Sequence, residues 1–130
     1  MHESTATALS YGIYKNAKNL FSPTEYQYCL FLDLGHSGFT TTVVGYLQGS
    51  LEVKGAEYDA NLGGRDFDYA LAVFLANEFQ AKYKMNPLEN KKSTIKLLQA
   101  AERAKKTISP SGVKEAVVNI ECLMEDLDFV

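Results

Sequence analysis

The alternation of apolar and polar positions divides the chain into a β-rich first half and a helical second half. Three β-prone segments follow one another at 28–34, 39–47 and 51–59. Residues 48–50 have the length and composition of a hairpin turn, which favours an antiparallel meander. The first strand is apolar at consecutive positions, which predicts a strand covered on both faces. The third strand alternates, which predicts one solvated face.

Two segments of the second half have the period of an amphipathic helix. The first begins near Asp66, runs to about Lys84 and ends before Pro87, because the residue before a proline avoids the α region. The second spans about 90–108. Their expected buried stripes comprise Phe67, Ala70, Leu71, Phe74, Leu75, Glu78, Phe79 and Tyr83 in the first helix and Ile95, Leu98, Ala101, Ala104 and Ile108 in the second.

The sequence patterns near the two ends of the chain predict shorter secondary-structure elements. A short helix is expected at 4–14, with Ser4 as its N-cap and Gly12 near its end. Alternation over 113–124 predicts a strand, which a turn at 125–126 joins to 127–130 as a small hairpin. The fold class is therefore α+β. Because the pattern starts abruptly and stops within an apolar strand, we expect an excised fragment.

The composition and net charge disfavour some classes of binding partner. The 130 residues are 46% hydrophobic, enough for a core, and the net charge is −3, which disfavours nucleic-acid and acidic-membrane surfaces. Cys29 and Cys122 lie in apolar runs, so we expect buried thiols in a reducing compartment. His2 and His36 are the only histidines and form no metal-ligand pattern. Without a signal-peptide pattern or a long apolar run, the protein is expected to be cytoplasmic.

A glycine-containing turn follows the first strand. The strand ends with the carboxylate of Asp33, and Gly35, His36, Ser37 and Gly38 then lead into the next β-prone run. Such a turn leaves backbone N–H groups available to an anion, and glycine allows a phosphate to approach the main chain. The same residues also suit an ordinary β-hairpin. From this stretch alone, both interpretations stay open.

The second predicted helix carries a polar stripe near its end. Glu102, Lys105, Lys106 and Ser109 recur at the spacing of one helix face. A Glu followed by Lys three and four residues later is usually a solvent-facing ion pair, and the stripe alone favours that interpretation.

Four stretches in order resemble one known domain: 5–12, 33–35, 62–68 and 101–109. Together they resemble the nucleotide-binding domain of the seventy-kilodalton heat-shock chaperone superfamily, which has an actin-like ATPase fold (ribonuclease H-like). The resemblance covers nearly the whole chain and implies a fragment of lobe II of that domain. Residues 1–60 would be part of subdomain IIA, with a helix and an antiparallel sheet. Residues 61–130 would be subdomain IIB, with two long helices and a hairpin.

Departures from the chaperone pattern point to one branch. The chaperones carry Gly-Gly-Thr-Phe-Asp where this chain has His36, Ser37, Gly38, Phe39 and Thr40. A histidine and a serine in that turn are similar to the hundred-and-ten-kilodalton branch, as are 11–15 and 119–124. That resemblance implies an ATP-binding nucleotide exchange factor for a 70-kDa heat-shock chaperone that also holds unfolded client proteins. A conventional chaperone ATPase and a passive interaction domain remain alternatives.

The resemblance also implies roles for single residues, with ATP or ADP and magnesium bound in the full-length protein. Asp33 is the implied catalytic group and would help to order magnesium-bound water. Gly35, His36, Ser37 and Gly38 would lie against the β- and γ-phosphates. On the second helix, Glu102 and Lys105 would meet the ribose, Lys106 would lie over the adenine and Ser109 would reach the base edge.

The same departures predict weak hydrolysis. Gly38 removes a hydroxyl close to the transferring phosphate, and Thr40 replaces a nearby carboxylate, whereas phosphoryl transfer depends on positioning and charge stabilisation. Other parts of the implied site are absent from this sequence. The isolated chain is therefore expected to bind ATP poorly and not to hydrolyse it.

Overall fold

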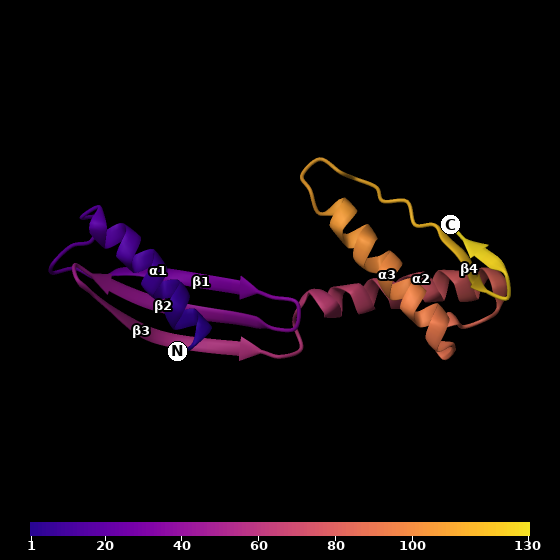
Figure 1. The fold of residues 1–130 in the computed structure, drawn as a ribbon, viewed down its shortest axis with the longest axis horizontal. Coiled ribbons are helices and arrows are strands. Elements are labelled where there is room, and N and C mark those ends of the chain that lie inside the picture. The colour runs from indigo at the N-terminus through magenta and orange to yellow at the C-terminus, as the bar shows by residue number, and fades with distance from the viewer. The chain divides into compact units, whose positions relative to one another are not determined.

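The first part of the chain is a helix packed on a three-stranded antiparallel sheet. The computed structural model describes all of residues 1–130, which divide into two units, Met1–Gly64 and Arg65–Val130. In the first unit the strands lie in the order β1-β2-β3, which confirms the predicted meander (Figure 1). Its elements are α1 (Glu3–Ala17), β1 (Gln27–Leu34), β2 (Phe39–Leu47) and β3 (Ser50–Asp59).

Helix α1 covers one face of this sheet (Figure 1). The Tyr46 hydroxyl of β2 donates to the Ala8 carbonyl oxygen at 2.7 Å, and the Tyr46 ring stacks on Phe21. Gly12 lies under that ring, because a Cβ added there would be 2.8 Å from Tyr46 Cε1. The interpretation of Gly12 as a helix end was therefore wrong. The N-cap is His2 and not Ser4.

The opposite face of β1 is exposed, so the prediction of a strand covered on both faces was wrong for this chain. Tyr28, Leu30, Leu32 and Leu34 point to that face and are 53–64% exposed. Consecutive apolar residues show that a strand can be buried on both faces, but the covering layer must come from other residues.

The alternation predicted for β3 fails at a β-bulge. Val43 pairs with Gly55 and the next residue, Val44, pairs with Val53, so Lys54 is the extra residue. A bulge shifts the alternation by one position. Leu51 and Val53 share a face with Ala56 rather than with Gly55. Only Leu51 in this strand is half-buried.

The second unit packs two helices and a small hairpin around one core, which confirms the α+β class. Its elements are α2 (Gly64–Tyr83), the short 3₁₀ helix η1 (Pro87–Glu89), α3 (Lys91–Ile108), β4 (Ile120–Met124) and β5 (Leu127–Phe129). The buried Ser93 hydroxyl of α3 donates to the Leu123 carbonyl oxygen at 2.6 Å and ties the helix to the hairpin. The core comprises Ala72, Ala76, Phe79, Leu97, Ala100, Ala101, Ile120, Leu123 and Phe129.

Both helices bury a face that differs in part from the predicted stripe. Phe67 and Phe74 of α2 are 44% and 59% exposed, and Ile95 of α3 is 50% exposed. Small residues share the buried positions with Phe79 and Leu97 and allow close packing of the elements. The positions that were placed correctly are Leu71, Leu75, Phe79 and Tyr83 in α2 and Leu98 and Ala101 in α3.

The predicted strand over 113–124 is formed only from Ile120 onward. Residues 113–119 have no partner strand, and a strand without a partner leaves its ladder hydrogen bonds unmade. Cys122 is exposed and Cys29 is half-buried, so the expectation of two buried thiols was also wrong, and both are free. None of the helices combines the length and hydrophobicity that crossing a membrane requires.

Candidate functional site

The turn between β1 and β2 is held by backbone contacts. The Gly35 N–H donates to the Gly38 carbonyl oxygen at 2.9 Å, directly after the last strand pair. The Gly64 N–H donates to the Gly35 carbonyl oxygen, also at 2.9 Å. Gly63 packs on the turn so closely that an added Cβ would overlap the His36 carbonyl oxygen and lie 2.7 Å from the Gly38 nitrogen. The turn is therefore braced by a glycine pair distant in sequence.

Three backbone donors of this turn face no protein acceptor. The N–H groups of His36, Ser37 and Gly38 make no hydrogen bond within the chain. His36 and Ser37 are exposed and Gly38 is half-buried, so a ligand could reach these donors. Exposed N–H groups of a turn can bind an anion. The turn is therefore a candidate phosphate-binding site.

Asp33 lies beside the turn, in a cavity that also involves helix α1. It pairs with Thr40 across the sheet, and both line a cavity of about 160 Å³. Glu3, Ser4 and Thr7 line it from the first turns of α1. Sequence reasoning missed these three residues. The i, i+3 spacing of two hydroxyls, Ser4 and Thr7, placed them on one helix face, but nothing local showed that this face meets Asp33.

The polar stripe on α3 forms an ion pair within the helix. Lys106 Nζ donates to Glu102 Oε1 at 2.7 Å, and both side chains are about half exposed or more. This hydrogen bond, and the negative charge of the same carboxylate, raise the pKa of Lys106. Ser109 is the C-cap, and its N–H donates to the Lys105 carbonyl oxygen. The solvent-facing pair considered from the sequence is therefore present.

Lys105 belongs to a different pair, which the sequence analysis missed. Its Nζ lies 2.7 Å from Asp68 Oδ1 on α2. The Asp68 side chain is only 10% exposed and that of Lys105 is 29% exposed. Asp68 therefore holds the Lys105 ammonium group between the two helices.

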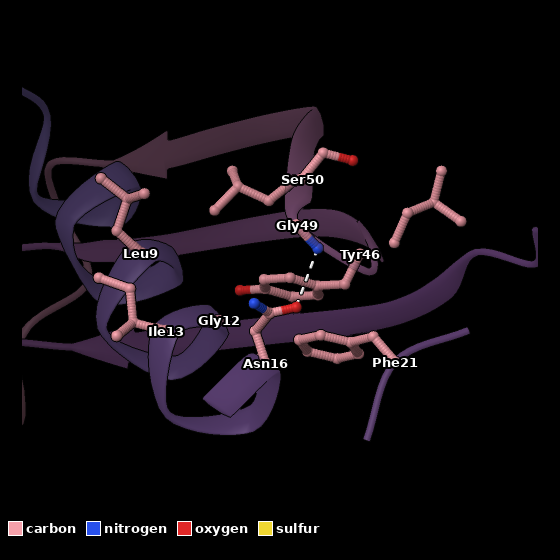
Figure 2. Close-up of a pocket in the computed structure, with 10 residues that line it drawn as sticks. Leu9, Gly12, Ile13, Asn16, Phe21, Tyr46, Gly49 and Ser50 are labelled. Carbon is pink, nitrogen blue, oxygen red and sulfur yellow. Dashed lines mark hydrogen bonds between the residues drawn. The ribbon is translucent and has the colours of Figure 1, made fainter. Parts of the chain in front are cut away.

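A second cavity, of about 190 Å³, lies between α1 and the β2–β3 hairpin (Figure 2). Asn16 Oδ1 accepts from the Gly49 N–H at 2.9 Å, and both residues line this cavity (Figure 2). The Tyr46 hydroxyl is also bonded, and burial, with lesser effects of Cys29 and Tyr11, raises the pKa of Tyr46 to about 12. Both polar groups therefore already have partners in the chain.

Comparisons with known proteins cover the whole chain. Residues 1–130 match the family model HSP70, described as Hsp70 protein. The chain is 46% identical to heat shock protein 88 of Dictyostelium discoideum and 43% identical to heat shock 70 kDa protein 16 of Arabidopsis thaliana, each over 128 residues. It is 40% identical to heat shock 70 kDa protein 4L of Homo sapiens. Each alignment covers 98% of this chain but only 15–16% of the relative.

Proposed function

This chain belongs to the Hsp70 protein family, and from that premise we propose that it forms part of the nucleotide-binding domain of a heat-shock chaperone. The α+β fold agrees with a lobe of the actin-like ATPase fold. The first unit would be part of subdomain IIA and the second would be subdomain IIB. The observation that carries the proposal is the braced turn with its three unpartnered N–H groups.

The turn would bind the phosphates of ATP or ADP. Backbone N–H groups bind phosphate oxygens whatever side chains flank them, so His36 and Ser37 need not contact the ligand through their side chains. The contacts of Gly35 and Gly63 fix the backbone before the ligand arrives. Binding therefore requires little reordering of the turn.

Magnesium would bind at this site together with the phosphates and not as a separately held ion. Within the chain, no cluster of three His, Cys, Asp or Glu side chains could hold a metal. Asp33 and Glu3 line the cavity beside the turn, and their negative charges would repel a bare phosphate. A divalent cation bound together with the phosphates would offset that repulsion. Asp33 would accept hydrogen bonds from water bound to the ion.

In the second unit, the end of α3 would contact the nucleoside. Glu102 and Lys105 would bind the ribose hydroxyls, because a carboxylate accepts and an ammonium group donates hydrogen bonds. Lys106 would lie over the adenine and Ser109 would reach the base edge. The ion pairs of the two lysines limit the orientations that their side chains adopt before binding.

A nuclear magnetic resonance titration of the whole chain tests both contributions separately. Magnesium tripolyphosphate is expected to shift the amide signals of residues 36–38 in a saturable manner. Adenosine is expected to shift the amide signals of residues 102–109 in the same way. Millimolar dissociation constants are expected, because the chain supplies only part of the implied site. A titration in which neither ligand moves its own segment would show the proposal to be wrong.

At the level of the whole protein, we propose an exchange factor for a 70-kDa heat-shock chaperone that also holds unfolded clients in the cytoplasm. His36, Ser37 and Gly38 support this branch, as does similarity to a relative named heat shock protein 88. A full-length protein containing this chain should speed the release of labelled ADP from a 70-kDa chaperone while its own ATP turnover stays slow. Fast turnover without accelerated release would favour a conventional chaperone ATPase instead.

A further inference from the structure

The phenol of Tyr58 occupies the space beside Gly38 in the turn. A Cβ added to Gly38 would lie 2.5 Å from Tyr58 Oη and 2.6 Å from its Cε2. Gly38 has no positive φ, so its backbone conformation does not demand glycine. A side chain at this position would meet the aromatic ring of Tyr58 on β3, which would have to move.

The Tyr58 hydroxyl is available to a ligand. The residue is 64% exposed, and its hydroxyl makes no hydrogen bond within the chain. Tyr58 pairs with Thr40 across the sheet, and both line an open groove with Glu3 and Ser4. The phenol thus stands on the side of the sheet that carries Asp33, next to Gly38.

We propose that Tyr58 is a phosphate-binding residue of this site, and that its hydroxyl donates to a phosphate oxygen held by the N–H groups of residues 36–38. This inference rests on the proposed function of the turn. A phenol is a good donor to an anionic oxygen, and hydrogen bonds to charged groups are stronger than those between neutral groups.

A side chain at position 38 would displace the Tyr58 phenol from its present position. The chaperone pattern carries a threonine at this position, and its Cβ would overlap the phenol. The chain can therefore present a hydroxyl at the turn from position 38 or from β3, but not from both in this arrangement. Tyr58 restores a donor that Gly38 lacks. A phenol anchored on another strand need not place its oxygen where a threonine would.

The test measures the affinity of the whole chain for magnesium tripolyphosphate, read from the amide signals of residues 36–38. Tyr58→Phe keeps the ring and removes the donor, and it should weaken binding about three- to tenfold, which is the range for an ordinary hydrogen bond and suits an exposed position. Tyr28→Phe is the matched control. Tyr28 is 61% exposed and lies on the opposite face of the same sheet, so affinity should not change.

A second pair of variants tests the steric argument. Gly38→Ala should displace the phenol and weaken binding as much as Tyr58→Phe does, and combining the two changes should add little further loss. Gly55→Ala is its control, because a Cβ there meets no atom within 4 Å. Thermal unfolding checks that all variants fold.

The outcomes separate this inference from the proposed function. If the turn signals respond to tripolyphosphate but Tyr58→Phe binds as tightly as the unchanged chain, Tyr58 is not a phosphate ligand, although the turn remains one. If the losses of affinity in Gly38→Ala and Tyr58→Phe are independent and additive, the steric argument that links the two residues is wrong. If no turn signal responds in any variant, both the inference and the proposed function are overturned.

Discussion

Replacing Asp68 by asparagine should destabilise the second unit and weaken nucleoside binding at the same time. The change keeps the shape of the side chain and removes the charge that lies 2.7 Å from Lys105 Nζ. Because that ion pair joins α2 to α3, its loss acts on the packing of both helices. It also releases the Lys105 ammonium group from the orientation in which we propose that it meets the ribose.

The size of the effect follows from the burial of the pair. Fully exposed ion pairs contribute about 0.2–1 kcal/mol, whereas breaking a buried pair costs about 3–5 kcal/mol. Asp68 is 10% exposed and Lys105 is 29% exposed, so this pair lies between the two cases. We expect Asp68→Asn to cost about 1.5 kcal/mol, within the range set by those limits. Lys105→Met should cost more, because it leaves the buried carboxylate without its cation.

A double-mutant cycle measures the pair itself. The single changes and the combined Asp68→Asn, Lys105→Met variant are compared by urea unfolding followed by circular dichroism, with an expected coupling energy of about 1–2 kcal/mol. Glu102→Gln is the control for stability, since it breaks an exposed pair on the same helix and should change the unfolding midpoint little. Adenosine titrations of residues 102–109 report the positioning role.

Two results would refute this reasoning. A coupling energy within about 0.5 kcal/mol of zero would mean that the two residues contribute independently. Unchanged adenosine affinity in Asp68→Asn, despite the expected loss of stability, would mean that Asp68 supports the fold but does not orient Lys105.

Three further predictions concern the first unit and the chain as a whole. Gly12→Ala should destabilise the first unit by about 1–3 kcal/mol through overpacking against Tyr46, although alanine is the better helix former, and a stabilised variant in urea unfolding would contradict this. The neutral Tyr46 phenol stabilises the folded state fully below pH 10.0, and this contribution should be lost as the pH rises from 10.0 to about 12; unfolding curves of Tyr46→Phe should lack that loss. In a sensitive phosphate-release assay, the isolated chain should not hydrolyse ATP, and turnover abolished by Asp33→Asn would show that the implied site is more complete than expected.

Local patterns were sufficient to predict most of the elements. The hairpin between β2 and β3 was predictable because its turn needs a residue with positive φ, and Gly49 supplies it with φ +78°. Both long helices were predictable from their period and from Pro87. These signals lie within a few residues of the element that they define. They need no knowledge of the tertiary structure.

What could not be predicted depends on contacts between residues distant in sequence. Whether 113–119 forms a strand depends on a partner strand, and the chain supplies none there. The bulge at Lys54 changes which side chains of β3 share a face, and nothing in the local alternation announces it. The pairing of Asp68 with Lys105 and the packing of Tyr58 on Gly38 likewise require the fold. The residues of the turn were found from sequence, but not the neighbours that shape the candidate site.

The two candidate contributions to nucleotide binding differ in how they tolerate substitution. In the turn, the donors are backbone N–H groups, and Gly35, Gly63 and Gly64 hold that backbone without using the side chains of His36 or Ser37. Side chains at 36 and 37 can therefore change while the phosphate-facing donors stay in place. On α3, the groups that would meet the nucleoside are side chains oriented by ion pairs, so a single charge change alters them. This difference would let the chain depart from the chaperone pattern in the turn and keep the backbone donors that we propose bind phosphate. It also implies that such departures act on hydrolysis, which depends on the side chains beside the transferring phosphate, more than on nucleotide binding.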